Sequence, residues 1–269
     1  MTTAENLNTD DTTPLWPDLL AFGIALACAW FLQWRTTELV WSLWLGSLVI
    51  GYLTILGIIA SGVYLGLRVL RHPQFPQDKS KPAVVIGSVI ALFLLGFFTF
   101  HFCAFHAGHA AFLSSFFPLE GLESRDFSDA FTNPFQLWHV AFTRIVPLFG
   151  LALVPVVIAE RRALLSPWKG AHRIAESIRD TEALDAQSLI QSKVIGKSAG
   201  GKHKSPMGNP FMGPYVNVIR MHLLIFAFAA LSVVGLENFG VFALVYAVYF
   251  FPWRAVFPSR KPAQPGTSP

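Results

Sequence analysis

The stretch PAVVIGSVIALFLLGFFTFHFCAFHAGHAAFLSSFFPL, residues 82–119, decides the fold class, because it contains no lysine, arginine, aspartate or glutamate. An α-helix needs about 20 apolar residues to cross the hydrocarbon core of a bilayer, and this run is longer than that. Three histidines, His101, His106 and His109, interrupt its apolar composition. The stretch therefore predicts a membrane-spanning helix that carries polar side chains.

The composition of the whole chain points the same way. Of its 269 residues, 53% are hydrophobic and 13% are charged, and this charge content is about half that of an ordinary globular domain. The two cysteines, Cys28 and Cys103, both lie in apolar runs, so a disulfide framework is excluded. We therefore expect the lipid bilayer to be the main partner of this protein.

Six apolar segments can be distinguished along the chain: 18–34, 39–67, 83–117, 135–159, 214–236 and 238–257. Backbone groups without hydrogen bonds are too costly in lipid, so continuous apolar runs predict helices. The fold class that follows is all-α, a polytopic transmembrane bundle of about six helices. The first segment is short and is followed by Gln33 and Arg35, so an interfacial helix is the alternative there.

The distribution of basic residues predicts the orientation, because cytoplasmic loops carry an excess of lysine and arginine. Of the 20 basic residues, 4 follow the second segment, 9 follow the fourth and 3 follow the sixth. The predicted organisation is a polar cytoplasmic N-terminus (1–17), helices one to four (18–159), a basic cytoplasmic insertion (160–213), helices five and six (214–257) and a cytoplasmic tail (258–269). The net charge of +4 thus reports topology, and we expect no nucleic-acid partner.

The second segment carries two pairs of small residues spaced four apart. These pairs are Ser47 with Gly51 and Gly62 with Gly66. Small residues at this spacing let a neighbouring helix approach closely in a membrane. The glycine face of helix two is therefore a candidate contact surface for a membrane-protein partner.

Ionisable residues inside a membrane are candidates for function, and they fall here into two predicted layers. An outer layer contains His106, His109, His139 and Glu237, and a central layer contains His101, Arg144 and His222, with Arg220 just below. Imidazoles spaced i and i+3 can share a metal ion, which makes His106, His109 and His139 the candidate metal ligands. A pair of histidines could instead ligate haem. The alternatives are hydrogen bonds between helices and a pathway for protons or solutes.

Arg144 poses a separate question, because it is predicted near the middle of the bilayer. A guanidinium there costs at least about 2.5 kcal/mol and needs a partner or a wet cavity, yet no acidic residue is predicted at its depth. An anionic substrate, a haem propionate or carbonyl groups freed near Pro147 are possible partners, and snorkelling to the surface is the alternative. Pro147 and Pro155 also predict a kinked or broken helix.

Three stretches resemble a family of uncharacterised bacterial multi-spanning membrane proteins, a domain of unknown function. They are WLGSLVIG (residues 44–51), FFTFHFCAFHAGHAAFL (residues 97–113) and Arg220-Met221-His222. In that family a Glu-Asn pair often follows the Trp-Leu, whereas this chain has Gly46 and Ser47 and so lacks an intramembrane carboxylate. The resemblance implies a bacterial inner-membrane location and transfers no chemistry.

No catalytic motif such as HExxH or CxxC is present, so the sequence favours a protein that is not an enzyme. The leading interpretation is a multi-pass protein of the bacterial inner membrane, of unassigned activity, with both termini in the cytoplasm. The alternatives are a membrane-embedded metal or haem binding protein, a transporter of a small or anionic solute, and a structural or scaffold protein.

Overall fold

The computed structural model describes residues 15–73, 75–179, 219, 223–228, 230–231, 233–235 and 239–251. Within these ranges every regular element is a helix, and Leu119 and Leu122 form an isolated bridge. The predicted all-α class is confirmed. Arg220, His222 and Glu237 lie outside the described residues, as do positions 180–213 of the predicted insertion.

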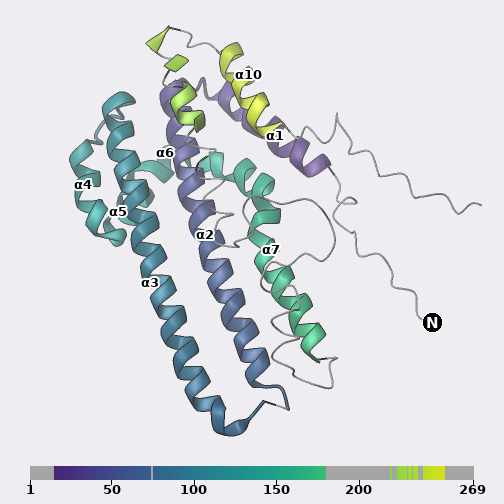
Figure 1. The fold of residues 1–269 in the computed structure, drawn as a ribbon. Coiled ribbons are helices and arrows are strands. Elements are labelled where there is room, and N and C mark those ends of the chain that lie inside the picture. Colours follow the sequence, from purple (N-terminus) through teal and green to yellow (C-terminus); the bar gives the residue numbers. More distant parts are fainter. Residues whose placement is uncertain are drawn as a thin grey trace, which may run out of the picture.

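Two long helices dominate the structure, α2 (Thr36–Leu70) and α3 (Gln77–Phe116), and they form an antiparallel hairpin (Figure 1). A capping box starts α2, in which the Glu38 carboxylate accepts a hydrogen bond from the backbone N–H of Arg35 at 2.8 Å. Pro76 occupies the N-cap of α3, where the missing N–H costs no helical hydrogen bond. Each of the two helices therefore has a defined start, and a short turn joins the end of α2 to the start of α3.

Three helical stretches are long and apolar enough to cross a membrane: α2, α3 and the composite run Pro134–Arg179. At about 1.5 Å per residue, the 35 residues of α2 extend over about 52 Å, beyond the roughly 30 Å of a hydrocarbon core. The first predicted segment is also a helix, α1 (Trp16–Phe31), but its 16 residues fall short of the usual spanning length. The predicted segments 18–34, 39–67 and 83–117 are thus confirmed as helices.

The fourth predicted segment is a helix that changes its winding twice. Its parts are α5 (Pro134–Val140), the π-helical turn η2 (Ala141–Ile145), α6 (Val146–Phe149), the 3₁₀ turn η3 (Gly150–Ala152) and the start of α7 (Leu153–Arg179). Proline cannot donate a backbone hydrogen bond, and the two irregular turns precede Pro147 and Pro155. The interruption that these prolines predict is confirmed.

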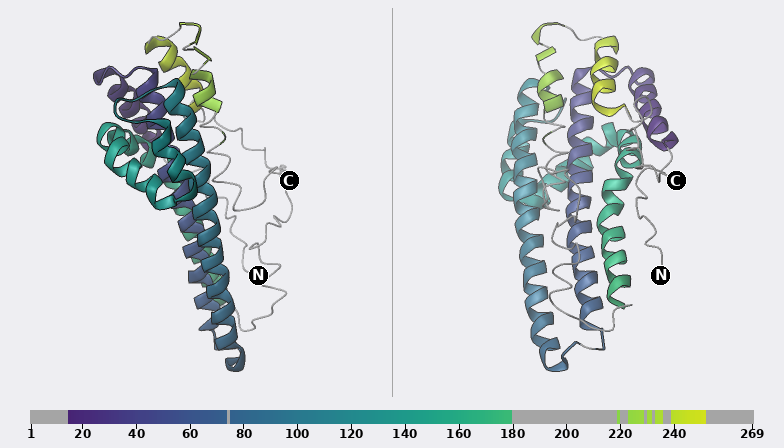
Figure 2. Two further views of the ribbon diagram at one scale, coloured as in Figure 1. Left: turned by 90° about the vertical axis from the view of Figure 1, so that its left-hand side faces the viewer. Right: turned by 45° about the vertical axis from the view of Figure 1, so that its right-hand side comes forward.

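Helix α7 continues well past position 159, where the predicted fourth span ends and the predicted insertion begins. It runs alongside α2 in the same direction (Figure 2). A methyl group built on Gly46 would lie 3.3 Å from Cγ1 of Val156, and one built on Gly57 would lie 3.9 Å from the carbonyl oxygen of Leu164. The first 20 residues of the predicted insertion are therefore part of the helical bundle.

Two short helices complete the end of the molecule at which α2 begins. Helix α10 (Phe239–Phe250) packs antiparallel on α1, with ring centroids 4.8 Å apart for Trp30 and Phe239 and 5.6 Å apart for Phe22 and Tyr246. Helix α4 (Ser124–Thr132) packs on the end of α3, where Ser114 and Ser124 form a hydrogen bond of 2.8 Å.

An ion-pair cluster joins α1 to α7. The Asp18 carboxylate pairs with Arg161, and with Arg162 at 3.4 Å, and its side chain is only 14% exposed. Arg161 lies one turn before Leu164, whose carbonyl oxygen would lie 3.9 Å from a methyl group built on Gly57 of α2, so the charged residues belong to the part of α7 that packs on α2. The Asp18 carboxylate offsets part of the positive charge of the two guanidinium groups, which lowers the free-energy cost of partly burying all three side chains between the helices.

The buried core and the exposed apolar surface occupy different halves of the hairpin. Trp41, Trp44, Phe102 and Phe127 are all at most 1% exposed and lie where α4 meets α2 and α3. In contrast, no residue of the most hydrophobic 18-residue window of α3 is buried, and Phe93 is 66% exposed. This half of α3 presents the surface of a helix in contact with lipid or with another membrane protein.

We predict that Gly51→Ala lowers the stability of the protein by about 1–3 kcal/mol, the usual cost of overpacking a core. A methyl group at this position would lie 2.5 Å from Cζ of Phe102, a ring that is 1% exposed. The matched control is Gly62→Ala in the same helix, where no described residue has an atom within 4 Å of the added methyl group. It should gain up to about 1 kcal/mol of helix propensity. Unfolding of the purified proteins in detergent measures both, and equal stabilities would contradict the close contact.

Candidate functional site

Of the singled-out histidines that the structure describes, His106 is the most enclosed, with 0% of its surface exposed. Its Nδ1 lies 3.0 Å from the carbonyl oxygen of Phe102, and its Nε2 lies 3.2 Å from Oγ of Ser47 on α2. A carbonyl oxygen only accepts hydrogen bonds, so Nδ1 must carry the proton. In the neutral ring, Nε2 is then the acceptor and the Ser47 hydroxyl is the donor.

Two tryptophans of α2 extend this polar contact along α3. The indole N–H of Trp44 donates to the carbonyl oxygen of His106 at 3.1 Å, and that of Trp41 donates to the carbonyl oxygen of Phe117 at 2.8 Å. Phe117 is the C-cap residue of α3, so this bond satisfies a carbonyl at the helix end. Together with Ser47, these bonds set both the distance and the register between α2 and α3.

An aromatic cluster encloses the Ser47–His106 pair. The Phe127 ring of α4 stacks on Trp41 at 5.8 Å and meets the edge of Trp44 at 6.1 Å, while Phe102 lies 4.2 Å from the His106 ring. Rings at these separations contribute about 0.5–1.5 kcal/mol per pair beyond their buried area. The imidazole is therefore held in an apolar, closely packed environment.

A serine that donates to histidine Nε2 is also the arrangement of a nucleophile with its general base. The surroundings here differ from those of a hydrolase in two respects. The partner of Nδ1 is a carbonyl of the same helix in place of a carboxylate, and Ser47 is only 7% exposed, so a substrate has no path to its hydroxyl. The geometry favours a structural hydrogen bond between two helices.

The other candidate metal ligands do not join His106 in a cluster. His109 is half-buried against Phe105, with ring centroids 5.1 Å apart, and His139 is exposed. In the part of the chain that the structure describes, no three or more His, Cys, Asp or Glu side chains gather as a metal site. His101, which was predicted in the central layer, is exposed and stacks on Phe97 at 5.7 Å.

Arg144 has a partner that the sequence did not identify. It lies in the π-helical turn η2, and its Nη1 donates to the carbonyl oxygen of Gly121 at 3.2 Å. Gly121 belongs to the loop between α3 and α4 and has a φ of +74°, a conformation that favours glycine. The guanidinium thus ties the interrupted helix to this loop.

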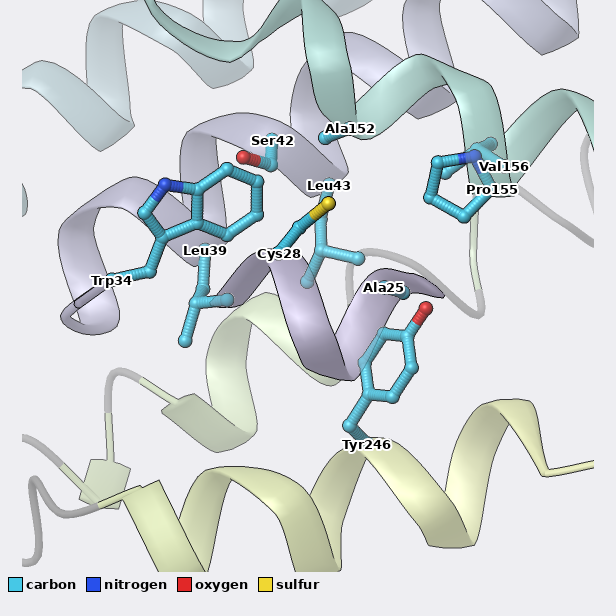
Figure 3. A pocket seen from close by; sticks show the side chains of 10 residues that line it. All are labelled: Ala25, Cys28, Trp34, Leu39, Ser42, Leu43, Ala152, Pro155, Val156 and Tyr246. Atoms are coloured by element: carbon cyan, nitrogen blue, oxygen red, sulfur yellow. The ribbon is translucent and has the colours of Figure 1, made fainter. Parts of the chain in front are cut away.

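The structure also contains a small pocket between α1, α2, α7 and α10 (Figure 3). Leu43 and Pro155 are among its apolar lining residues, and the Cys28 sulfur and the Tyr246 hydroxyl are among its few polar atoms. Its volume of about 30 Å³ is enough for a water molecule. A haem or an organic solute needs a pocket of several hundred Å³, so this pocket does not fit one.

We predict that Ser47→Ala lowers stability by about 1–3 kcal/mol, the cost of leaving a buried polar group without its hydrogen-bond partner. Ser61→Ala is the matched control, because Ser61 lies in the same helix and is 6% exposed, but bonds only to the carbonyl of Ile58. It should cost clearly less. Equal losses in detergent unfolding experiments would mean that the bond to His106 adds nothing.

Comparison with known proteins finds one matching family model. Residues 6–141 match the model of a family described as a family of unknown function (DUF6498). No curated protein and no solved structure matches the chain. The matched region contains α2, α3 and α4, and hence both Ser47 and His106. Because the match covers just over half of its length, the chain belongs to this family of unknown function, DUF6498.

Proposed function

We propose that the chain is a multi-pass protein of the bacterial inner membrane that serves as a structural or scaffold component. The observation that carries this proposal is that polar side chains singled out by the sequence, the buried His106 and the exposed Arg144, bond to groups within the fold. Both ring nitrogens of His106 have partners within the fold, and the Arg144 guanidinium bonds to Gly121. Side chains used in this way support a fixed helical frame.

The location in a membrane is supported by the contrast between the two long helices. The most hydrophobic window of α2 is 61% buried inside the protein, whereas that of α3 is 0% buried. An apolar surface of this length needs lipid or another membrane protein as its environment. The bacterial assignment draws on the family resemblance of the sequence.

A scaffold role is supported by surfaces that remain open on α2. Of the two pairs of small residues, Ser47 and Gly51 face α3 within the fold. Among the described residues, none places an atom within 4 Å of a methyl group built on Gly62 or Gly66. This second pair offers a neighbouring membrane helix a close approach to the backbone.

The proposed orientation has the basic connections in the cytoplasm. It is supported by the course of α7, which follows α2 toward the turn that carries Arg68, Arg71, Lys79 and Lys81 (Figure 2). Basic residues from distant parts of the sequence thus lie at the same end of the bundle. A shared side is what the excess of positive charge in cytoplasmic loops leads us to expect.

Metal or haem binding is the weaker alternative. A metal ion would have to displace either Ser47 or the carbonyl of Phe102 from the ring of His106. Transport through a site at Arg144 is likewise less supported, because the guanidinium already bonds to the Gly121 carbonyl. We therefore assign these residues a packing role.

The orientation can be tested with single cysteines introduced into the full chain. Arg125→Cys should react with a membrane-impermeant maleimide in intact spheroplasts, whereas Lys202→Cys should react only after permeabilisation. The unsubstituted chain, which contains only Cys28 and Cys103, gives the background labelling. The reverse pattern would contradict the proposed orientation.

The packing role predicts that protein purified in detergent contains no stoichiometric zinc, copper or iron and has no Soret band. His106→Ala should lower the unfolding temperature without changing either result, because the imidazole stabilises helix contacts. Metal analysis and an absorption spectrum are the measurements. One metal or haem per chain, lost in His106→Ala, would establish ligation and contradict the proposal.

A further inference from the structure

One end of the bundle is strongly basic, and it combines parts of three helices. The basic residues are Arg68, Arg71, Lys79, Lys81, Lys169, Arg173 and Arg179, and the acidic residues are Asp78 and Glu176. The helices meet there because α7 runs beside α2, with the rings of Tyr64 and Trp168 6.4 Å apart. A surface with this excess of positive charge fits an anionic partner.

Within this basic end, Arg68 is held in place by an aromatic side chain. Its Nε donates to the Tyr64 hydroxyl at 3.2 Å, and its guanidinium carbon lies 5.4 Å from the centre of the same ring. Tyr64 in turn packs on Trp168. The guanidinium is thus oriented at the junction of α2 and α7, and Lys169 directly follows Trp168 in α7.

These two basic groups are not neutralised by any described residue of the fold. Among the described residues, no carboxylate lies within ion-pair distance of Arg68 or Lys169, and both side chains belong to exposed residues. Trp168 and Leu165 beside them are 44% and 49% exposed. A tryptophan next to basic residues is typical of the boundary between acyl chains and headgroups.

We propose that Arg68 and Lys169, together with the Tyr64–Trp168 pair, bind the phosphate of an anionic phospholipid headgroup at the junction of α2 and α7. Arginine and lysine supply the charge that a phosphate requires, and Trp168 lies against the start of the acyl chains. The inference rests on the proposed location in a membrane. It does not depend on which side of the membrane the basic end faces.

The test uses the full chain in a neutral detergent, with phosphatidylglycerol, phosphatidylcholine or inorganic phosphate added in increasing amounts. Binding is read as the rise in unfolding temperature and as bound lipid in native mass spectrometry. Phosphatidylglycerol should stabilise the protein, and the Arg68→Gln/Lys169→Gln variant should bind it about 30-fold more weakly, since each basic residue near an anionic lipid contributes about 1 kcal/mol. Arg68→Lys/Lys169→Arg should retain most of the binding.

The matched control is Lys79→Gln/Lys81→Gln, which removes the same charge from the same end but away from Tyr64 and Trp168. It should weaken binding less than about threefold. Equal losses in the two double variants, or equal stabilisation by phosphatidylcholine or by inorganic phosphate, would overturn the proposal. The measurement is made in detergent and does not depend on the orientation of the protein in the membrane. A negative result would therefore overturn the lipid site without contradicting the proposed orientation, which cysteine labelling tests separately.

Discussion

The close approach of α2 to α3 is the contact on which the rest of the structure depends. With no side chain at Gly51, the ring of Phe102 can lie where a methyl group would be 2.5 Å from its nearest atom. This approach brings the Ser47 hydroxyl within 3.2 Å of His106. In an apolar interior an imidazole without hydrogen-bond partners would be costly, so the pairing also opposes sliding of one helix along the other.

The contact between α2 and α3 fixes two straight helices, whereas the interrupted fourth helix lets the chain change direction. The π turn at Ala141–Ile145 and the 3₁₀ turn at Gly150–Ala152 alter the winding ahead of two prolines, and Arg144 fixes the first of them to Gly121. After these turns, α7 follows α2 and places Arg161 beside Asp18. An ion-pair cluster thus joins α1 to α7, and aromatic rings join α4 to α2.

Much of the helical framework follows from the sequence, because long charge-free runs in a bilayer leave the backbone little choice but a helix. The predictions for α1, α2 and α3 are of this kind, whereas the break near Pro147 follows from the backbone N–H that proline lacks. The end of the fourth helix was harder to predict. Charged residues from Glu160 onward predict where the membrane-spanning segment ends, but they do not predict that the helix itself continues beside α2 to Arg179.

The site was predictable only in part. His106 was selected because a histidine in an apolar run is unusual, but single-residue reasoning does not identify its partner across 59 positions of sequence. The matching depth of Ser47 and His106 in antiparallel helices was the available signal. Counting residues along a regular helix predicts Arg144 near the middle of the bilayer, but it does not identify the carbonyl of Gly121 in the connecting loop as its hydrogen-bond partner.

The protonation of the His106 ring gives the most direct test of this account. Solid-state NMR of ¹⁵N-histidine-labelled protein in lipid bilayers reports the state of each ring nitrogen, and a His106 variant identifies its signals among those of the eight histidines. The structure predicts a neutral ring with the proton on Nδ1 and a hydrogen-bonded, unprotonated Nε2. A proton on Nε2 alone, or a doubly protonated ring, would contradict the donation from Ser47 that joins α2 to α3.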